Sequence, residues 1–255
     1  MVLRLQSCPG AEMLADRVQE QTVRVLESDP ELGETLDAVR FERARLEAIA
    51  RVRRLAPGTW NEPEWPREVL NGYGLLLLNG LMIRRVSLGG RAGGELLSTG
   101  DLLRPWQRED DSASVLRSSA WRVLERADVA LLDLRFGLRV SPYPEIASQL
   151  IARTLRRARY FAVIMAIVHQ PRVDMRVLML LWHLADRCGR VGRDGVLVPM
   201  RLTHAILADL LAARRPTISG ALGALEREGL LSHTPEGWLL YGAPPGEMAA
   251  VADGS

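Results

Sequence analysis

The sequence contains no lysine. All 33 basic residues are arginine, and 31 acidic residues leave a formal net charge of only +2. A chain so close to neutral does not bind nucleic acid through its overall charge, so any contact with DNA must come from arginines that cluster locally. Each arginine is a planar, permanently charged group that fits phosphate or guanine.

Cysteine and histidine are also scarce. Two cysteines, Cys8 and Cys188, are too few for a four-ligand metal site or a disulfide framework. Residues 60–136 contain no histidine, which excludes the usual metal site of a cupin-type enzyme there. We therefore expect no metal, no cofactor and no enzymatic activity. The four histidines are scattered: His169, His183, His204 and His233.

Long apolar runs are missing as well. No stretch of ~20 uninterrupted apolar residues occurs, and the residues after Met1 lack the apolar core of a signal peptide. The sequence therefore predicts a cytoplasmic protein that does not bind membranes. Its 255 residues, 47% hydrophobic and 25% charged, suffice for two ordinary globular domains.

The clearest motif lies between Pro199 and Gly229. Thr203 is a helix N-cap, and apolar residues follow it at helical spacing. After a short link, Pro216 suits the first turn of a second helix, which Gly229 ends. Two short helices so joined predict a helix-turn-helix. Their apolar positions are Ile206, Leu207, Leu210 and Leu211, then Ile218, Ala221, Leu222 and Leu225.

The flanking residues predict the sheet of a winged helix. Leu230–His233 and Trp238–Tyr241 are short β-like runs on either side of a turn, and Gly195–Pro199 is a candidate third strand. Winged helix-turn-helix domains bind DNA, but winged helices also dock partner proteins. A protein-interaction module without specific DNA binding therefore remains the alternative.

The region from Trp60 to Phe136 has a different character. Short apolar runs separated by glycine-rich turns predict a small antiparallel barrel or jelly roll, the double-stranded β-helix also found in cupins. Asn79-Gly80 is the strongest two-residue hairpin signal, and Glu109–Ser112 is expected to be an exposed loop. The runs are Leu75–Leu78, Leu81–Leu88, Glu95–Leu97 and Val129–Leu132.

Helices are expected on both sides of this region. Asp29-Pro30 starts a predicted helix that continues to about Ile49, and Ala50–Leu55 alternates as a half-buried strand does. A long helix is predicted over Glu145–His169, with four arginines facing water: Arg153, Arg156, Arg157 and Arg159.

The second half of the long helix, Tyr160–Val168, is apolar on every face, which predicts burial on every face. One side would rest on the β domain and the other on a second copy of the helix; burial between the chain's own two domains is the alternative. The predicted dimerisation residues are Ile151, Leu155, Phe161, Ile164, Met165 and Val168.

A further helix over Asp174–Cys188 and a polar link over Gly189–Gly195 lead into the winged domain. The patterns predict an α+β chain with four parts. These are helices and a β domain (1–141), a long dimerisation helix (142–170), the winged helix-turn-helix (171–245) and a flexible tail (246–255).

In this order of parts, and most specifically over Val198–Leu231, the chain resembles the CRP/FNR family of bacterial transcription regulators. The resemblance implies a β-roll of the cyclic-nucleotide-binding type and a homodimer on palindromic double-stranded DNA, with RNA polymerase as a candidate partner. It also implies that Arg215 reads guanine and that Thr203 and Thr217 hold phosphate. Arg214 and Ser219 complete the predicted DNA-binding set. Pro216 and Gly220 depart from the family's base-reading glutamate and second arginine, so the preferred bases should differ.

The predicted effector site departs further from the family. Members of the family that bind cyclic nucleotides carry Gly-Glu, followed about ten residues later by arginine and a small hydroxyl residue. Here Arg117-Ser118-Ser119 resembles the second part, but Gln107-Arg108 stands at the place of the first. Gly94-Glu95 lies too far upstream. The resemblance thus implies a degenerate effector pocket, with Arg117, Ser118 and Ser119 as candidate lining residues.

Overall fold

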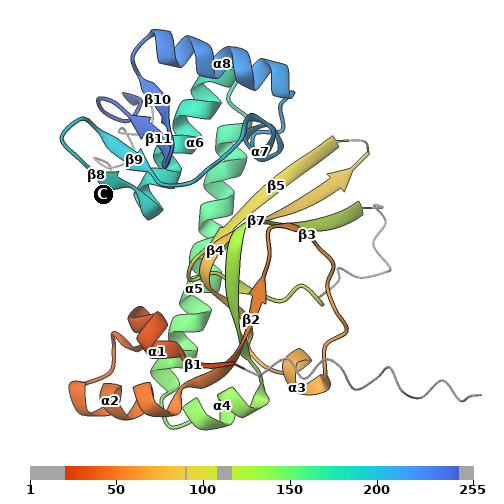
Figure 1. Ribbon diagram of the computed structural model, residues 1–255, viewed down its shortest axis with the longest axis vertical. Coiled ribbons are helices and arrows are strands. Elements are labelled where there is room, and N and C mark those ends of the chain that lie inside the picture. Colours follow the sequence, from red (N-terminus) through yellow and green to blue (C-terminus); the bar gives the residue numbers. More distant parts are fainter. Residues whose placement is uncertain (1–20, 90, 108–116, 247–255) are drawn as a thin grey trace, which may run out of the picture.

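The computed structural model describes residues 21–89, 91–107 and 117–246. The predicted loop at 109–112 and most of the predicted tail lie outside these ranges. A β domain occupies the middle of the molecule, one long helix runs along it, and a smaller helix-and-sheet domain sits at one end (Figure 1). Among the described residues, no helix combines the length and apolar character needed to cross a membrane.

The β domain is one antiparallel sheet in the order β1-β2-β7-β4-β5, with β3 paired to β7 and β6 paired to β4. Two long strands, β4 and β7, form its centre, and their inward residues, such as Leu75, Leu77 and Val129, are fully buried. The antiparallel prediction is confirmed, although the central strands are longer than the short runs expected. The bounds are β1 Thr22–Arg24, β2 Ile49–Leu55, β3 Gly58–Trp60, β4 Gly74–Leu88, β5 Arg91–Ser98, β6 Leu102–Leu103 and β7 Arg117–Leu132.

The hairpin predicted at Asn79-Gly80 is wrong, because β4 continues through both residues. Its register with β7 shifts there, as in a β-bulge. The Asn79 side chain donates to Asp128 Oδ2 at 2.8 Å and accepts from the Asp128 amide at 3.0 Å. At Gly80 φ is +93°, and an added Cβ would lie 2.4 Å from the Arg126 carbonyl oxygen. The pair therefore bends a strand instead of reversing it.

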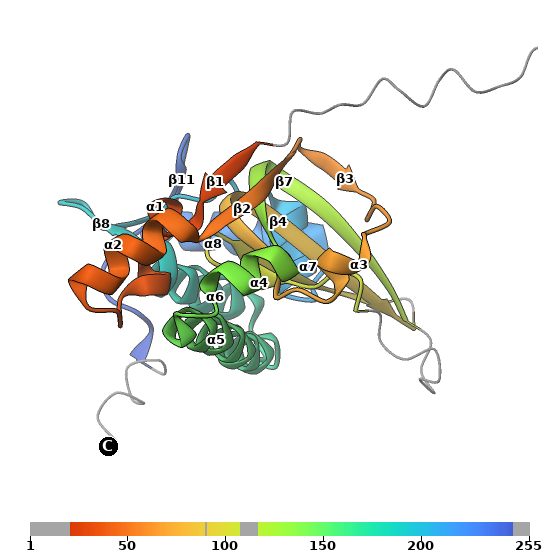
Figure 2. The ribbon, with the colours of Figure 1, turned by 90° about the horizontal axis from the view of Figure 1, so that it is seen from below.

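The helix predicted from Asp29 to Ile49 is divided into two. A 3-10 turn, η1 (Pro30–Gly33), follows the short α1 (Val25–Ser28), and α2 (Ala38–Glu47) starts afresh. The break occurs because Asp37 caps α2, its side chain accepting from the Arg40 amide at 2.9 Å. Two further helices, α3 (Arg67–Leu70) and α4 (Leu134–Val140), flank the sheet (Figure 2). The strand expected at Ala50–Leu55 is confirmed as β2.

The long helix is present as α5 (Pro144–Val168), and Pro144 lies in its first turn, where the missing N–H is tolerated. Two of its four arginines do not face water as predicted: Arg157 is half-buried beside Glu95, and Arg153 is buried. Its guanidinium donates to Asp29 Oδ1 at 2.7 Å and to the Gly100 carbonyl oxygen at 3.3 Å. A buried charge requires such a partner, and this pair joins α5 to the N-terminal segment.

The C-terminal domain follows the predicted order. Helix α6 (Val173–Cys188) leads into α7 (His204–Leu210), α8 (Arg215–Arg227) and a sheet in the order β10-β11-β9-β8. Strands β9 (Val196–Val198), β10 (Leu231–Thr234) and β11 (Gly237–Leu240) match the expectation. The link expected at Gly189–Gly195 instead contains a short strand, β8 (Arg190–Val191), which pairs with β9.

The two domains share a buried core. Leu81 and Ile83 of the β domain belong to the same apolar cluster as the buried residues of α6, α7 and α8. At the seam, β5 passes so close to α7 that a Cβ on Gly94 would lie 3.3 Å from the Asp209 carbonyl carbon. Arg85 and Asp209 form an ion pair across the same seam at 3.3 Å. The helix-turn-helix is therefore docked on the β4–β5 hairpin.

Candidate nucleic-acid interface and ligand cavity

The predicted DNA-binding residues gather where α8 begins. The face of α8 that carries Ile218, Leu222 and Leu225 is buried in the domain core. Arg214, Arg215 and Thr217 remain exposed at the N-terminal turn, where backbone N–H groups and the helix dipole favour an anion. The structure thus places the three side chains on one accessible surface.

Two predicted residues have structural partners. The Thr203 hydroxyl accepts from the Ile206 amide at 3.3 Å as the N-cap of α7. The Ser219 hydroxyl donates to the Arg215 carbonyl oxygen at 3.1 Å and lies 2.8 Å from His204 Nδ1. Ser219 therefore ties α8 to α7. His204, which the sequence did not single out, supplies that tie.

A hollow of about 520 Å³ lies between α7, α8 and the β10–β11 hairpin. Thr203, His204 and Arg215 line it, together with His233 of the hairpin. The His233 ring packs edge-on against Trp238, with ring centroids 4.9 Å apart. The hollow adds His204 and His233 to the candidate interface. In the sequence, the only indication that these two histidines belong to the interface was their position beside the helix-turn-helix motif.

The outward face of α8 is nearly bare. Gly220 and Gly223 lie there with nothing within 4 Å of an added Cβ. Because neither has a side chain, the helix backbone can approach a groove closely. Between residues 216 and 225, α8 carries no charged side chain.

The predicted dimerisation residues divide between two faces of α5. Ile151, Leu155 and Met165 lie on one stripe and are 62%, 54% and 45% exposed, and Phe161 is exposed beside them. Ile164 is buried in the chain's own core, and Val168 packs against that core. Only four of the six predicted residues are therefore exposed and free to meet a partner: Ile151, Leu155, Phe161 and Met165.

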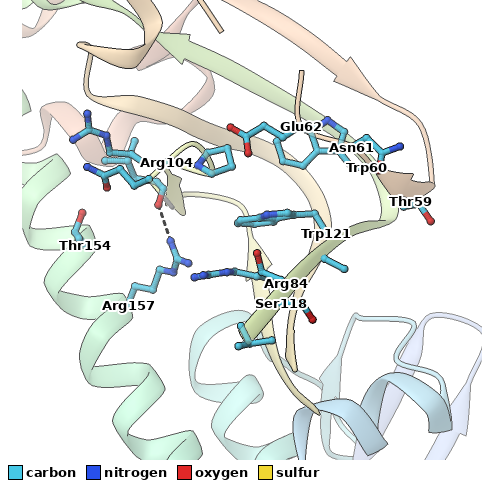
Figure 3. Close-up of a pocket in the computed structure, with 16 residues that line it drawn as sticks. Thr59, Trp60, Asn61, Glu62, Arg84, Arg104, Ser118, Trp121, Thr154 and Arg157 are labelled. Carbon is cyan, nitrogen blue, oxygen red and sulfur yellow. Dashed lines mark hydrogen bonds between the residues drawn. The ribbon is translucent and has the colours of Figure 1, made fainter. Parts of the chain in front are cut away.

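A cavity of about 670 Å³ separates the β domain from α5, and Ser118 and Ser119 are among the residues that line it. Arg117 begins β7, but its side chain lies outside the described part of the chain. Three arginines that the sequence analysis did not assign to the site also line the cavity: Arg84 from β4, Arg104 directly after β6, and Arg157 from α5 (Figure 3). These arginines come from separate segments of the chain, so no local sequence motif could predict that they lie together.

The Glu95 carboxylate holds two of these arginines in place, and Arg104 donates to the Leu70 carbonyl oxygen at 3.0 Å. Arg157 Nη2 lies 2.7 Å from Glu95 Oε1, and Arg157 also donates to the Leu102 carbonyl oxygen at 2.8 Å. Arg84 reaches the same carboxylate at 3.9 Å and lies over the Trp121 ring. The cavity therefore combines fixed guanidinium groups with an aromatic wall, which suits a planar anion. In the described part of the chain, no three His, Cys, Asp or Glu side chains gather as a metal site would need.

Comparison with known proteins identifies part of this architecture. The family model for the Crp-like helix-turn-helix domain matches residues 175–240. No curated protein matches the sequence. Among solved structures, a CooA mutant from Carboxydothermus hydrogenoformans is 15% identical, with a TM-score of 0.58, and the match covers 91% of this chain and 95% of that one.

Two other solved structures have the same architecture. FixK2 from Bradyrhizobium japonicum is 16% identical, with a TM-score of 0.55, and 81% of this chain and 98% of FixK2 are covered. A CRP/FNR-family transcriptional regulator from Thermus thermophilus is 18% identical, with a TM-score of 0.53 and coverage of 75% and 93%. Residues 175–240 are thus a Crp-like helix-turn-helix domain, and the chain has the fold of CRP/FNR-family regulators.

Proposed function

We propose that the protein is a transcription regulator that binds a specific DNA sequence as a homodimer in the cytoplasm. The observation that carries this proposal is the turn that opens α8, where Arg214, Arg215 and Thr217 are exposed while the opposite face of the helix is buried. A helix presented in this way can enter the major groove with its N-terminal residues against base edges. RNA polymerase is a further candidate partner on the bound promoter.

The exposed stripe of α5 supports the homodimer. Ile151, Leu155 and Met165 recur at the spacing of one helix face, opposite the face that packs on the β domain. A second copy of the same stripe would cover it in a symmetric pair. Two copies of α8 would then meet successive major grooves about 34 Å apart on a palindrome.

A binding screen with randomised DNA duplexes tests the proposal. We expect enrichment of a palindromic sequence whose half-sites are one helical turn apart. An unenriched pool would favour the alternative, a winged helix that docks a partner protein. The protein carrying Arg214→Ala and Arg215→Ala serves as control, because both side chains are exposed and their loss should abolish enrichment without unfolding the domain.

We further propose that the arginine-lined cavity beside α5 is a degenerate effector site that does not take the family's cyclic nucleotides. Ser118 and Ser119 are present, but Gln107-Arg108 stands where the phosphate clamp has its Gly-Glu, and Gly94-Glu95 lies too far upstream. Calorimetry should therefore give weak or no binding of cyclic AMP and cyclic GMP. Micromolar affinity for either, lost on Arg117→Ala, would contradict this expectation.

A further inference from the structure

A second cavity, which Arg157 also lines, lies where the β domain meets the first helix of the C-terminal domain. It measures about 400 Å³ and is walled by α5, α6 and the turn that joins β5 to β6. A cavity of this size can hold a small organic molecule. Because its walls belong to both domains, an occupant would touch the β domain and the first helix of the DNA-binding domain together.

Two residues that line this cavity each have a buried polar atom with no hydrogen-bond partner in the described part of the chain. These atoms are the Tyr160 hydroxyl oxygen and His183 Nε2. Their rings stack with centroids 3.9 Å apart. A buried polar atom without a partner is unfavourable, so a ligand that bonds to both would be stabilised.

The chemistry of each atom is fixed by its surroundings. Burial raises the pKa of Tyr160, so the phenol remains a neutral hydroxyl that can donate. Burial lowers the pKa of His183, while a hydrogen bond to the Tyr160 backbone acts in the opposite direction. A neutral imidazole has one donor and one acceptor nitrogen, and in the tautomer that carries its proton on Nδ1 the unpartnered Nε2 is the acceptor. The pair thus offers one donor and one acceptor side by side.

Charged groups complete the lining. Arg153 is paired with Asp29, and Arg187 is paired with Asp101 at 2.9 Å. Arg156 and Asp186 also line the cavity, and neither has an ion pair within the described residues. A guanidinium group without a partner suits a carboxylate, and a lone carboxylate beside an acceptor nitrogen suits a hydrogen-bond donor.

We propose that this second cavity binds a small carboxylic acid that carries an amino or hydroxyl group next to its carboxylate. The carboxylate contacts Arg156 and the Tyr160 hydroxyl, and the neighbouring donor contacts His183 Nε2 and Asp186. The proposal is independent of the arginine-lined effector cavity and of DNA binding. Occupancy would fix the angle between α6 and the β domain.

Calorimetry on the full chain tests the proposal with three probes of one shape: L-leucine, its 2-hydroxy analogue and 4-methylpentanoate. We expect the amino or the hydroxy acid to bind with Kd of about 1 mM or better, and about tenfold more tightly than the plain acid, which lacks the donor. The preferred probe identifies the donor as an ammonium or a hydroxyl group.

Matched variants then locate the site. Tyr160→Phe removes only one oxygen and should weaken the preferred probe about tenfold, as should Arg156→Gln. Arg104→Gln alters only the first cavity and should leave the affinity unchanged. The proposal is overturned if no probe binds, if the plain acid binds as tightly as the others, or if Tyr160→Phe has no effect. A crystal structure soaked in the preferred probe that shows only water at Tyr160 and His183 overturns it equally.

Discussion

At the scale of single residues, Arg215 combines exposure, charge and position at the start of α8. If it reads guanine, Arg215→Ala should relax the base preference at one position of each half-site, a loss of ~1–3 kcal/mol of discrimination. Binding to a panel of single-base operator variants at fixed salt measures this, because phosphate contacts make affinity steeply salt-dependent. If Arg215→Ala lowers the affinity equally for every operator variant, Arg215 contributes only electrostatic attraction and does not read a base.

Thr217→Ala is the matched control for that measurement. Thr217 is exposed on the same turn, and a phosphate contact carries no base information, so its loss should weaken all sequences alike. Thr203→Ala is a poorer control because it removes the N-cap of α7, which is worth ~1 kcal/mol of stability. Its effect on DNA binding should be read only where the domain remains folded.

A second residue-scale prediction concerns the buried His183. Because burial lowers its pKa, the unfolded chain takes up a proton below the ordinary pKa of about 6.5 while the folded chain does not. The free energy of unfolding should therefore fall as the pH drops from about 7 through the ordinary pKa, and then level off below the lowered pKa.

Urea unfolding of the wild type and His183→Phe over that pH range measures the effect. Phenylalanine keeps a ring against Tyr160 but cannot be protonated, so the slope should flatten. Asp186 and Arg187 face the same histidine with opposite effects on its pKa, and both remain in the variant. An unchanged slope would show that another group titrates.

Arg153 illustrates what the sequence cannot reveal at this scale. In the sequence, Arg153 lies close to three other arginines of the same predicted helix, and all four were predicted to face water. Its partner Asp29 lies 124 positions away in the chain, and only the fold brings the two together. Local patterns show which residues are charged but not which distant residue neutralises them.

At the scale of elements, most helices and strands of the winged domain could be predicted from the sequence. For the β domain, only the antiparallel β class could be predicted, not the individual strands. Thr203, Pro216 and Gly229 act on the backbone within one helical turn of their own positions, so their places in the sequence fix where α7 and α8 begin and end. Asn79-Gly80 was misinterpreted because a hairpin and a bulge use the same residues. Which of them forms depends on Asp128 of β7, a strand much later in the chain.

The exposed stripe of α5 yields an element-scale prediction. Leu155→Glu with Met165→Glu should give a soluble monomer, because both side chains are exposed in the single chain and would be covered only by a partner. Sedimentation at micromolar concentration measures the change. Ile164→Glu is the contrasting control: it buries a charge in the chain's own core and should unfold the protein. A dimer that survives both stripe substitutions would contradict the proposed interface.

The face of α8 that carries Gly220 and Gly223 yields a second element-scale prediction. Gly220→Ala places a methyl group in open space within a helix and should raise the free energy of unfolding by about 0.5–1 kcal/mol. If this face approaches the groove closely, the same methyl group should weaken DNA binding. A variant that is more stable and binds DNA as tightly as the wild type would show that this face stays clear of DNA.

At the scale of the whole molecule, the order of parts was predictable, but their docking was not. Periodicity and turn residues are local signals, whereas the contact of α7 with β5 depends on surfaces more than a hundred residues apart. The Arg85–Asp209 pair at this seam is partly exposed and should contribute little stability by itself. Close apolar packing around Gly94 is the stronger element of the contact.

Neighbouring glycines of β5 allow that docking to be tested. A Cβ on Gly94 would lie 3.0 Å from Ile83 Cδ1 and 3.3 Å from the backbone of Asp209, whereas a Cβ on Gly93 would meet nothing within 4 Å. Gly94→Val should therefore push α7 away from the β domain, while Gly93→Val should not. Hydrogen exchange of the amides in α7 measures the separation, with faster exchange expected only for Gly94→Val. If DNA affinity changes in the same variant and not in its neighbour, the docked seam controls how α8 is presented to DNA. Equal exchange in the two variants would mean that the two domains do not depend on this contact.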